Sequence, residues 1–389
     1  MLSLDEFAAG KLRSLASRDL LRTLRPSERE DGLAIVRDGR RLLSFCCNDY
    51  LNLSHHPAVK AAAQQAVERY GAGAGASRLV TGNHPLLERL EARLAALKGA
   101  EAACVFGSGY LANAGIIPTL VGETDLILVD ELVHACIWSG AKLSASVTVA
   151  FRHNDLDHLS DLLRSRRGKH ARCLIATDGV FSMDGDLAPV HALAALAAEH
   201  DAWLLTDDAH GVGVVGGGRG SSFAGGRKAD VPLQMGTLSK ALGSYGGYLC
   251  ASRPVIDLIK SRARTLVYST GLPPASAAAA LAALDLIEAD PDLAARPVRK
   301  ARLFTRLMDL PPAESPIVPL IIGSAAAALE AAQTLEAEGF LVTAIRPPTV
   351  AEGTSRLRLT FTAGHPDAEI ERLATVLRRQ GLGRPEEGR

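Results

Sequence analysis

A lysine and an aspartate at the ends of two apolar runs are the side chains best placed to do chemistry. Lys240 lies in Met235-Gly-Thr-Leu-Ser-Lys240, and Asp207 closes an apolar run 33 residues earlier. This interval suits one strand–helix–strand crossover, so both side chains would stand at strand ends. A lysine amine can form a Schiff base, and a carboxylate can keep a pyridine nitrogen protonated. The pair therefore predicts an enzyme that uses pyridoxal phosphate (PLP).

Two glycine-rich segments are candidates for binding phosphate. Residues 106–113 follow a predicted strand and open a predicted helix, where backbone amides favour an anion. Residues 211–216 match the GxGxxG pattern of dinucleotide sites, but three more glycines follow within residues 217–220. No helix can begin there to receive a pyrophosphate. We expect this second segment to loop around the rim of the active site.

Two histidines lie close to predicted strand ends. His134 follows a predicted strand at 126–129, and by itself it favours a helix cap or a buried, hydrogen-bonded ring. His210 comes three residues after Asp207, so we expect both to face one site. None of the eleven histidines has the spacing of a metal-ligand set, and we expect no metal.

Composition and charge narrow the function classes. Basic and acidic residues number 43 each, and a net charge of zero argues against nucleic-acid or membrane-surface binding through bulk charge. The longest apolar helical run, residues 277–284, is too short to span a bilayer. The acidic N-terminus does not resemble a signal peptide, and six cysteines without a CxxC pair predict reduced thiols in the cytoplasm.

Short apolar runs alternate with helical patterns from about residue 46 onward. This alternation predicts an α/β fold with a mainly parallel central sheet flanked by helices. Ligands of such sheets bind at the carboxyl ends of the strands, where Asp207 and Lys240 both fall. Helices are predicted at 59–70 and 85–98, and strands at 102–106, 126–129, 147–151, 173–177, 203–206, 233–236 and 248–251.

The chain divides into three predicted parts. Residues 1–45 form an N-terminal segment, a surface helix and a hairpin around 33–45, that packs near the small domain. Residues 46–273 form the large PLP-binding domain. Residues 274–389 form a linker helix and a smaller α+β domain, in which a polar tail at 383–389 frays. Its predicted elements are the linker helix at 274–289, strands at 317–322, 341–345 and 357–361, and helices at 326–338 and 367–379.

Several motifs, in order along the chain, resemble one enzyme family. They are Asn48-Asp-Tyr-Leu-Asn-Leu-Ser-His-His-Pro57, residues 75–84, 179–185 and 207–211, and the Lys240 segment. Together they resemble the α-oxoamine synthases, which are PLP enzymes of fold type I. The resemblance covers residues 22–377, with one departure: Asn52 stands where the family signature usually has glycine.

The resemblance implies roles for individual residues. Lys240 would bond PLP, and Asp207 would bond the ring nitrogen. His210 would bond the 3-oxygen, and His134 would stack on the ring. These four are the implied catalytic residues. The other residues implied to hold the cofactor are Ser108, Gly109, Tyr110, Ser182, Thr237 and, across a homodimer, Thr270. Those implied to contact substrate are His134, Arg22, Asn48, Thr349 and Arg358, the last as the carboxylate-binding arginine.

Residues 344–349 and 353–360 are most similar to the family member that acts in biotin biosynthesis. The resemblance then implies a decarboxylative condensation of L-alanine with a pimeloyl group, carried on coenzyme A or acyl carrier protein, through a PLP quinonoid. The alternatives with the same chemistry are 2-amino-3-ketobutyrate ligase, 5-aminolevulinate synthase and serine palmitoyltransferase. A non-catalytic regulatory subunit of the same fold would be expected to lose Lys240, and a dehydrogenase would bind a nicotinamide cofactor at residues 211–216.

Overall fold

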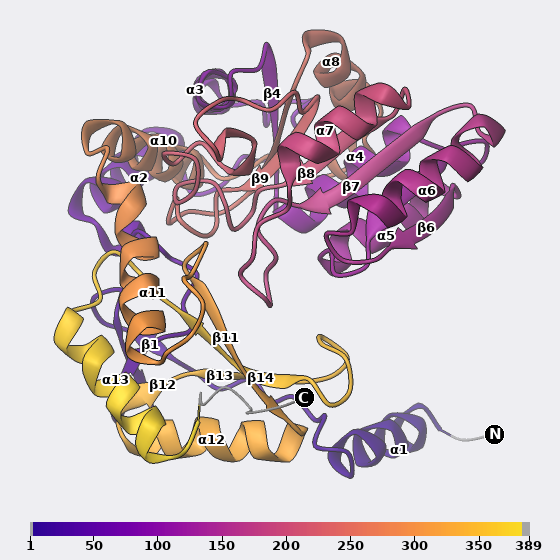
Figure 1. Ribbon diagram of the computed structural model, residues 1–389. Coiled ribbons are helices and arrows are strands. Elements are labelled where there is room, and N and C mark those ends of the chain that lie inside the picture. Colours follow the sequence, from indigo (N-terminus) through magenta and orange to yellow (C-terminus); the bar gives the residue numbers. More distant parts are fainter. Residues whose placement is uncertain (1–2, 383–389) are drawn as a thin grey trace.

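The computed structural model describes residues 3–382, which form two lobes (Figure 1). The predicted polar tail at 383–389 lies outside the described residues. The larger lobe holds a seven-stranded sheet, and the smaller lobe holds a three-stranded and a four-stranded sheet. Among the described residues, no helix combines the length and the apolar character that a membrane crossing needs.

The seven-stranded sheet has the order β4-β10-β9-β8-β7-β5-β6. Strand β10 runs antiparallel to both of its neighbours, and the other pairs are parallel, which confirms the predicted mainly parallel sheet. Each strand lies within one residue of its predicted bounds. The strands are β4 (Ala102–Phe106), β5 (Leu126–Asp130), β6 (Val147–Phe151), β7 (Cys173–Asp178), β8 (Trp203–Asp207), β9 (Leu233–Thr237) and β10 (Gly247–Ala251).

Helices cover both faces of this sheet, because its strands are apolar on both sides. In β4, Cys104 packs in a cluster with α4, whereas the next residue, Val105, packs in a second cluster with α2, α3 and α10. The helices of this lobe are α2 (Pro57–Tyr70), α3 (Pro85–Lys98), α4 (Gly109–Leu120), α5 (Ala135–Ser144), α6 (Leu156–Arg166), α7 (Val190–Glu199), α8 (Arg253–Arg262), α9 (Arg264–Val267) and α10 (Pro274–Ala289).

The smaller lobe is built from the C-terminal part of the chain and the N-terminal hairpin. Its antiparallel sheet has the order β11-β14-β13, and its second sheet has the order β1-β2-β3-β12, in which β12 pairs with β3 in parallel. The division of the chain at residues 45 and 273 stays a prediction. The elements are β1 (Glu28–Arg29), β2 (Ala34–Arg37), β3 (Arg40–Ser44), α11 (Arg296–Leu307), β11 (Ile317–Gly323), α12 (Ala325–Ala337), β12 (Phe340–Leu341), β13 (Thr343–Ile345), β14 (Ser355–Thr360) and α13 (Asp367–Arg379).

The single strand predicted at 341–345 is wrong. The chain changes sheets at Val342, so Phe340 pairs with Leu43 of β3 whereas Thr343 pairs with Arg358 of β14. Val342 itself is buried between the two pairings. A continuous apolar run looks the same whether it has one partner or two, so the pattern could not reveal the break.

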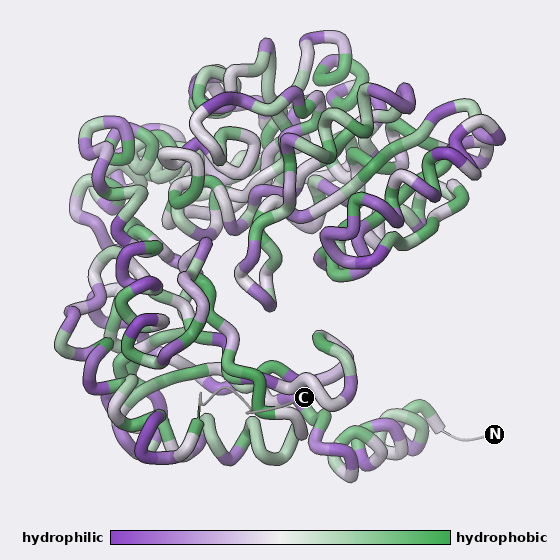
Figure 2. The backbone as a smooth tube through the Cα atoms, in the orientation of Figure 1, coloured by the Kyte–Doolittle hydropathy of each residue, from purple (hydrophilic) through white to green (hydrophobic). Residues whose placement is uncertain are grey.

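The N-terminal helix α1 (Leu4–Ala16) projects from the small lobe (Figure 1). Ser3 and Glu6 cap it reciprocally, which accounts for where it begins. None of its residues is buried, and Leu4 and Phe7 are exposed. Figure 2 shows both apolar and polar stretches along this helix. The predicted surface helix is therefore confirmed.

Candidate active site

A cavity of about 230 Å³ lies where β4, β5, β7, β8 and β9 end. The carboxyl ends of parallel strands form such a site because loops and helix N-termini converge there. Eight of the predicted site residues line it: Ser108, Gly109, Tyr110, His134, Asp207, His210, Thr237 and Lys240. The remaining six, Ser182, Thr270, Arg22, Asn48, Thr349 and Arg358, lie outside the lining.

Lys240 reaches the cavity from the loop that follows β9. Its Nζ lies 2.6 Å from His210 Nε2. Burial lowers the pKa of Lys240 from 10.5 to about 8, although the carboxylate of Asp207 opposes this shift. The positive charge of Arg358 lowers the pKa of Lys240 further. The amine is therefore much closer to its neutral, nucleophilic form than an exposed lysine would be.

His210 connects Lys240 to a buried tyrosine. Its Nδ1 lies 2.6 Å from the Tyr50 hydroxyl, which donates to Asn48 Oδ1 at 3.3 Å. Burial holds the pKa of His210 well below its usual range and raises that of Tyr50 to about 12. Tyr50 therefore keeps its proton and His210 is neutral. One ring nitrogen of His210 contacts Tyr50 and the other contacts Lys240, so the ring connects the two side chains.

Asp207 is fixed by hydrogen bonds at the end of β8. Its Oδ2 accepts from Asn113 Nδ2 at 2.7 Å, and its Oδ1 accepts from the backbone N–H of Ala209 at 2.9 Å. The neighbouring carboxyl of Asp178 is also buried, and burial, followed by the charge of Asp207, raises the pKa of Asp178 well above its usual range. Asp178 is therefore biased toward its protonated form.

The start of α4 forms part of the cavity wall. Ser108 caps this helix, its Oγ accepting from the Leu111 N–H at 3.2 Å. A Cβ at Gly109 would lie 3.1 Å from Met235 Cε and would partly fill the space beside Thr237. A helix N-terminus attracts an anion through its unpaired amides and its dipole. The glycine keeps that terminus accessible.

His134 caps a helix and also lines the cavity. It is the N-cap of α5, where Nδ1 accepts from the Cys136 N–H at 3.3 Å. Its ring also lines the cavity beside Asp207. The cap holds the ring at the cavity wall, so the structural role and the predicted site role do not compete.

Arg358 approaches the cavity from the smaller lobe. It is buried on β14, where Nη1 donates to Asn48 Oδ1 at 3.2 Å and Nε donates to the carbonyl of Ser182. Asn48 therefore joins Arg358 to the chain of contacts through Tyr50 and His210 that ends at Lys240. Ser182 contributes a backbone carbonyl to this arrangement and does not line the cavity.

Comparison with known proteins identifies the family. The model of the aminotransferase class I and II family matches residues 40–377. An 8-amino-7-oxononanoate synthase of Beijerinckia indica is 66% identical over 377 residues, covering 97% of this chain and 98% of the relative. The chain belongs to the 8-amino-7-oxononanoate synthases. It is therefore an enzyme of the α-oxoamine synthase family, as the sequence motifs predicted.

Solved structures agree with this assignment. A structure of SPT with a PLP internal aldimine superposes with a TM-score of 0.91 at 27% identity, covering 98% of both chains. An 8-amino-7-oxononanoate synthase of Francisella tularensis gives a TM-score of 0.75 at 27% identity, covering 87% of this chain and 98% of that one. The fold is fold type I, and the enzyme is PLP-dependent, which confirms both predictions.

The residues present in the cavity fit PLP. They offer an amine with a lowered pKa at Lys240, a hydrogen-bonded carboxylate at Asp207, and a helix N-terminus opened by Gly109. These three groups match an aldehyde, a ring nitrogen and a phosphate respectively. The roles of the individual residues remain predictions.

Some predicted residues lie away from the cavity. Arg22 Nη2 donates to Thr349 Oγ1 at 2.9 Å, so the structure joins these two to each other but not to the cavity wall. Thr270 forms an isolated antiparallel bridge with Ser77.

Four residues of the site were not predicted from the sequence: Tyr50, Asn113, Cys136 and Asp178. Tyr50 and Asn113 belong to motifs already singled out, but nothing in their spacing shows that they contact His210 and Asp207.

The expectation that residues 211–216 loop around the rim of the active site is wrong. Val212 and Val214 are buried in the cluster that includes α10, and residues 211–216 are absent from the cavity lining. The stretch folds back on itself, because the Gly213 N–H donates to the carbonyl of Gly218 at 2.8 Å. Its glycines form a compact turn.

Proposed function

We propose that this enzyme condenses L-alanine with a pimeloyl thioester, carried on coenzyme A or acyl carrier protein, as a homodimer. The products would be 8-amino-7-oxononanoate, the free thiol and carbon dioxide. The names of its relatives support the product. One geometric observation supports amino-acid chemistry: the chain of contacts Lys240–His210–Tyr50–Asn48–Arg358 connects the amine to a buried guanidinium.

When bound at Lys240, PLP would supply an electron sink for the charge that develops at the alanine Cα. Once displaced by alanine, the Lys240 amine would take the Cα proton and later return one, as a general base and acid within reach. Its pKa of about 8 suits both directions near neutral pH. Asp207, held by Asn113, would keep the proton on the ring nitrogen.

Arg358 would bind the carboxylate of alanine, because a guanidinium matches the geometry of a carboxylate. Its contacts with the Ser182 carbonyl and with Asn48 would fix its orientation before substrate arrives. Arg22 and Thr349, which already contact each other, would meet the acyl donor outside the cavity. Thr270 would reach the phosphate of the other subunit.

The function is tested by turnover of the PLP-loaded protein. L-alanine, glycine and serine are each combined with pimeloyl-coenzyme A, pimeloyl-acyl carrier protein, acetyl-, succinyl- and palmitoyl-coenzyme A, and the products are identified by mass spectrometry. We expect a product only from alanine with a pimeloyl donor. Exclusive use of glycine or serine would assign the chain to one of the sibling reactions, and no turnover with any pair would favour a regulatory subunit.

The role of Asp207 has its own test. In Asp207→Asn, exchange of the alanine Cα proton with D2O should slow by about 100-fold or more, because the ring nitrogen loses its anionic partner. Proton NMR measures the exchange. Asp257→Asn, on the exposed side of α8, serves as the matched control and should exchange at the wild-type rate. Wild-type exchange in Asp207→Asn would contradict the proposed role.

A further inference from the structure

A short hairpin follows β7 and lies between the two lobes. Val180 and Leu187 form its antiparallel bridge, and the Phe181 N–H donates to the carbonyl of Asp186 at 3.0 Å. Gly185 lies at its turn with φ of +81°, and a Cβ there would sit 2.2 Å from the carbonyl oxygen of Ile317 on β11. The hairpin therefore touches the smaller lobe closely at its tip.

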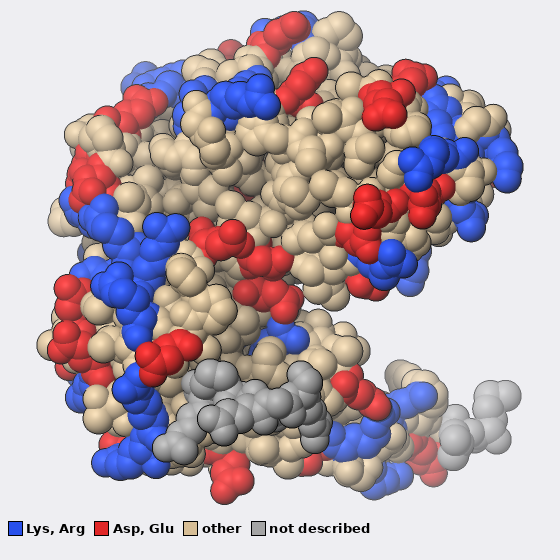
Figure 3. All heavy atoms as spheres, in the orientation of Figure 1, with Lys and Arg blue, Asp and Glu red and all other residues tan. Residues whose placement is uncertain are grey.

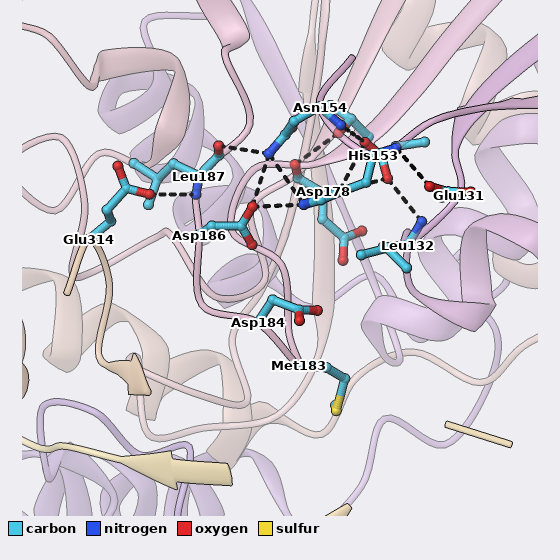
Figure 4. Close-up of polar contacts among 12 residues, drawn as sticks. Glu131, Leu132, His153, Asn154, Asp178, Met183, Asp184, Asp186, Leu187 and Glu314 are labelled. Atoms are coloured by element: carbon cyan, nitrogen blue, oxygen red, sulfur yellow. Dashed lines mark hydrogen bonds and ion pairs between the residues drawn. The ribbon is translucent and has the colours of Figure 1, made fainter. Parts of the chain in front are cut away.

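On the larger lobe, a histidine holds the base of this hairpin (Figure 4). His153 follows β6; its Nδ1 lies 3.0 Å from Asp130 Oδ1 and its Nε2 lies 2.7 Å from Asp186 Oδ2. Asn154 Nδ2 also donates to Asp186 Oδ2, at 2.9 Å, and to the carbonyl of Leu187, at 3.3 Å. Both ring nitrogens thus face carboxylates, so both act as donors.

The two carboxylates keep His153 charged. Burial would lower the pKa of His153, but hydrogen bonds to Asp130 and Asp186 outweigh burial and raise it to about 10. Asp130 is buried at the end of β5 and also accepts from the backbone N–H groups of Leu132 and Asn154. His153 is therefore an imidazolium that ties the hairpin to a rigid point of the central sheet.

On the smaller lobe, two arginines of β14 contact the same hairpin. Arg356 pairs with the carboxylate of Asp184, and its Nη1 donates to the carbonyl of Met183 at 3.4 Å. Arg358 donates from Nε to the carbonyl of Ser182. The hairpin is thus the direct link between the His153 contact and the guanidinium proposed to bind alanine.

The base of the hairpin is packed, since Val180 and Phe181 are buried, but Asp184 and Asp186 border an open side, where polar contacts hold the chain. A hollow of about 480 Å³ borders it, lined in part by Asp184, Asp186 and Glu314. Figure 3 shows acidic side chains gathered in the hollow between the lobes. A segment with an open side is held less by apolar packing and more by its charged contacts.

We infer that His153 is a positioning residue: its bridge between Asp130 and Asp186 fixes the hairpin at residues 180–187 and thereby the orientation of Arg358 toward the alanine carboxylate. The inference rests on the proposed function through the role given to Arg358. His153 lies outside the cavity lining, so we assign it no contact with substrate. It acts through the hairpin, whose Ser182 carbonyl contacts Arg358 directly.

The test compares His153→Gln and Asp186→Asn, singly and together, with His170→Gln. His170 is the matched control, since its side chain makes no hydrogen bond within residues 3–382. Hydrogen–deuterium exchange of residues 180–187 is measured first, without substrate. The dissociation constant of L-alanine for the PLP-loaded protein follows from its absorbance, and the KM of the pimeloyl donor from turnover.

We expect faster hydrogen–deuterium exchange at 180–187 and alanine binding weakened by about tenfold or more, because Arg358 would no longer be held in the orientation that binds the carboxylate. The KM for the pimeloyl donor should not change. Both single changes remove the same contact, between His153 and Asp186. The loss of alanine affinity in the double variant should therefore be smaller than the product of the losses in the two single variants. Should His153→Gln fail to fold, Asp186→Asn decides by the same results.

Two outcomes separate the inference from the function on which it rests. If Arg358→Gln loses alanine binding while His153→Gln and Asp186→Asn bind alanine as the wild type does, the inference is overturned and the function stands. If the wild-type protein does not bind alanine, the proposed function is refuted. If hydrogen–deuterium exchange at residues 180–187 is the same in His153→Gln as in the wild type, His153 does not fix the hairpin and the inference is overturned.

Discussion

Lys240 should react as a partly neutral amine near pH 7, unlike an exposed lysine. Burial lowers its pKa from 10.5 to about 8. At pH 7 a pKa of about 8 leaves roughly a tenth of the amine neutral, whereas a pKa of 10.5 leaves about 0.03%. Since only the neutral amine attacks an aldehyde, Lys240 should combine with PLP about 300-fold faster at pH 7 than an unperturbed lysine of equal reactivity.

The assay follows uptake of PLP by apoenzyme in a stopped-flow spectrophotometer between about pH 6 and 10. A model lysine amine measured in the same buffers accounts for the titration of PLP itself. The rate should rise with a midpoint near pH 8 and then level off. Arg358→Gln should move the midpoint to higher pH, because Arg358 lowers the pKa of Lys240. A wild-type rate that still rises at pH 10 would refute the reasoning.

Two further predictions concern stability. Asn52 adopts a left-handed conformation with φ of 57°, and its Oδ1 accepts from the Gly364 N–H at 2.7 Å. Asn52→Ala should therefore lower the free energy of unfolding by about 1–3 kcal/mol, and Asn52→Gly by less, in urea titrations; equal loss in both would contradict a backbone contribution. Burial lowers the pKa of His365 from 6.5 to about 4. The contribution of this histidine to the free energy of unfolding is therefore complete above pH 6.5 and is lost as the pH falls towards 4. His365→Gln should lack this loss of up to about 3 kcal/mol between pH 7 and pH 4, and an identical pH profile in the variant would exclude His365 as its source.

The position of Asn52 shows how a local preference explains a departure from a family signature. Glycine is favoured where φ is positive, and asparagine is one of the few other residues that adopt this conformation readily. The replacement therefore keeps the backbone conformation and adds side-chain contacts with Gly364 and Gly32. The sequence revealed the departure, but only the structure showed why it is tolerated.

The sequence by itself predicted the order of strands and helices along the chain. It also predicted a site at the carboxyl ends of the parallel strands, with Lys240 and Asp207 as the candidate central pair, and the structure places both in one cavity. Those features are local: apolar periodicity, glycine and proline at element ends, and polar residues just after buried strands. Strands β7 and β8 run one residue beyond the apolar pattern, because Asp178 and Asp207 still pair with each other across the sheet.

The tertiary structure alone decided which distant groups meet. The Tyr50–His210 contact spans 160 positions, and the contact of Arg358 with the Ser182 carbonyl spans 176. It also decided that the apolar run at 341–345 serves two sheets, and that His153 faces two carboxylates. Such contacts arise when separate elements pack together, and packing leaves no periodic trace in the chain. The pKa values of Lys240 and His210 follow from that packing, because burial is a property of the folded molecule and not of the segment.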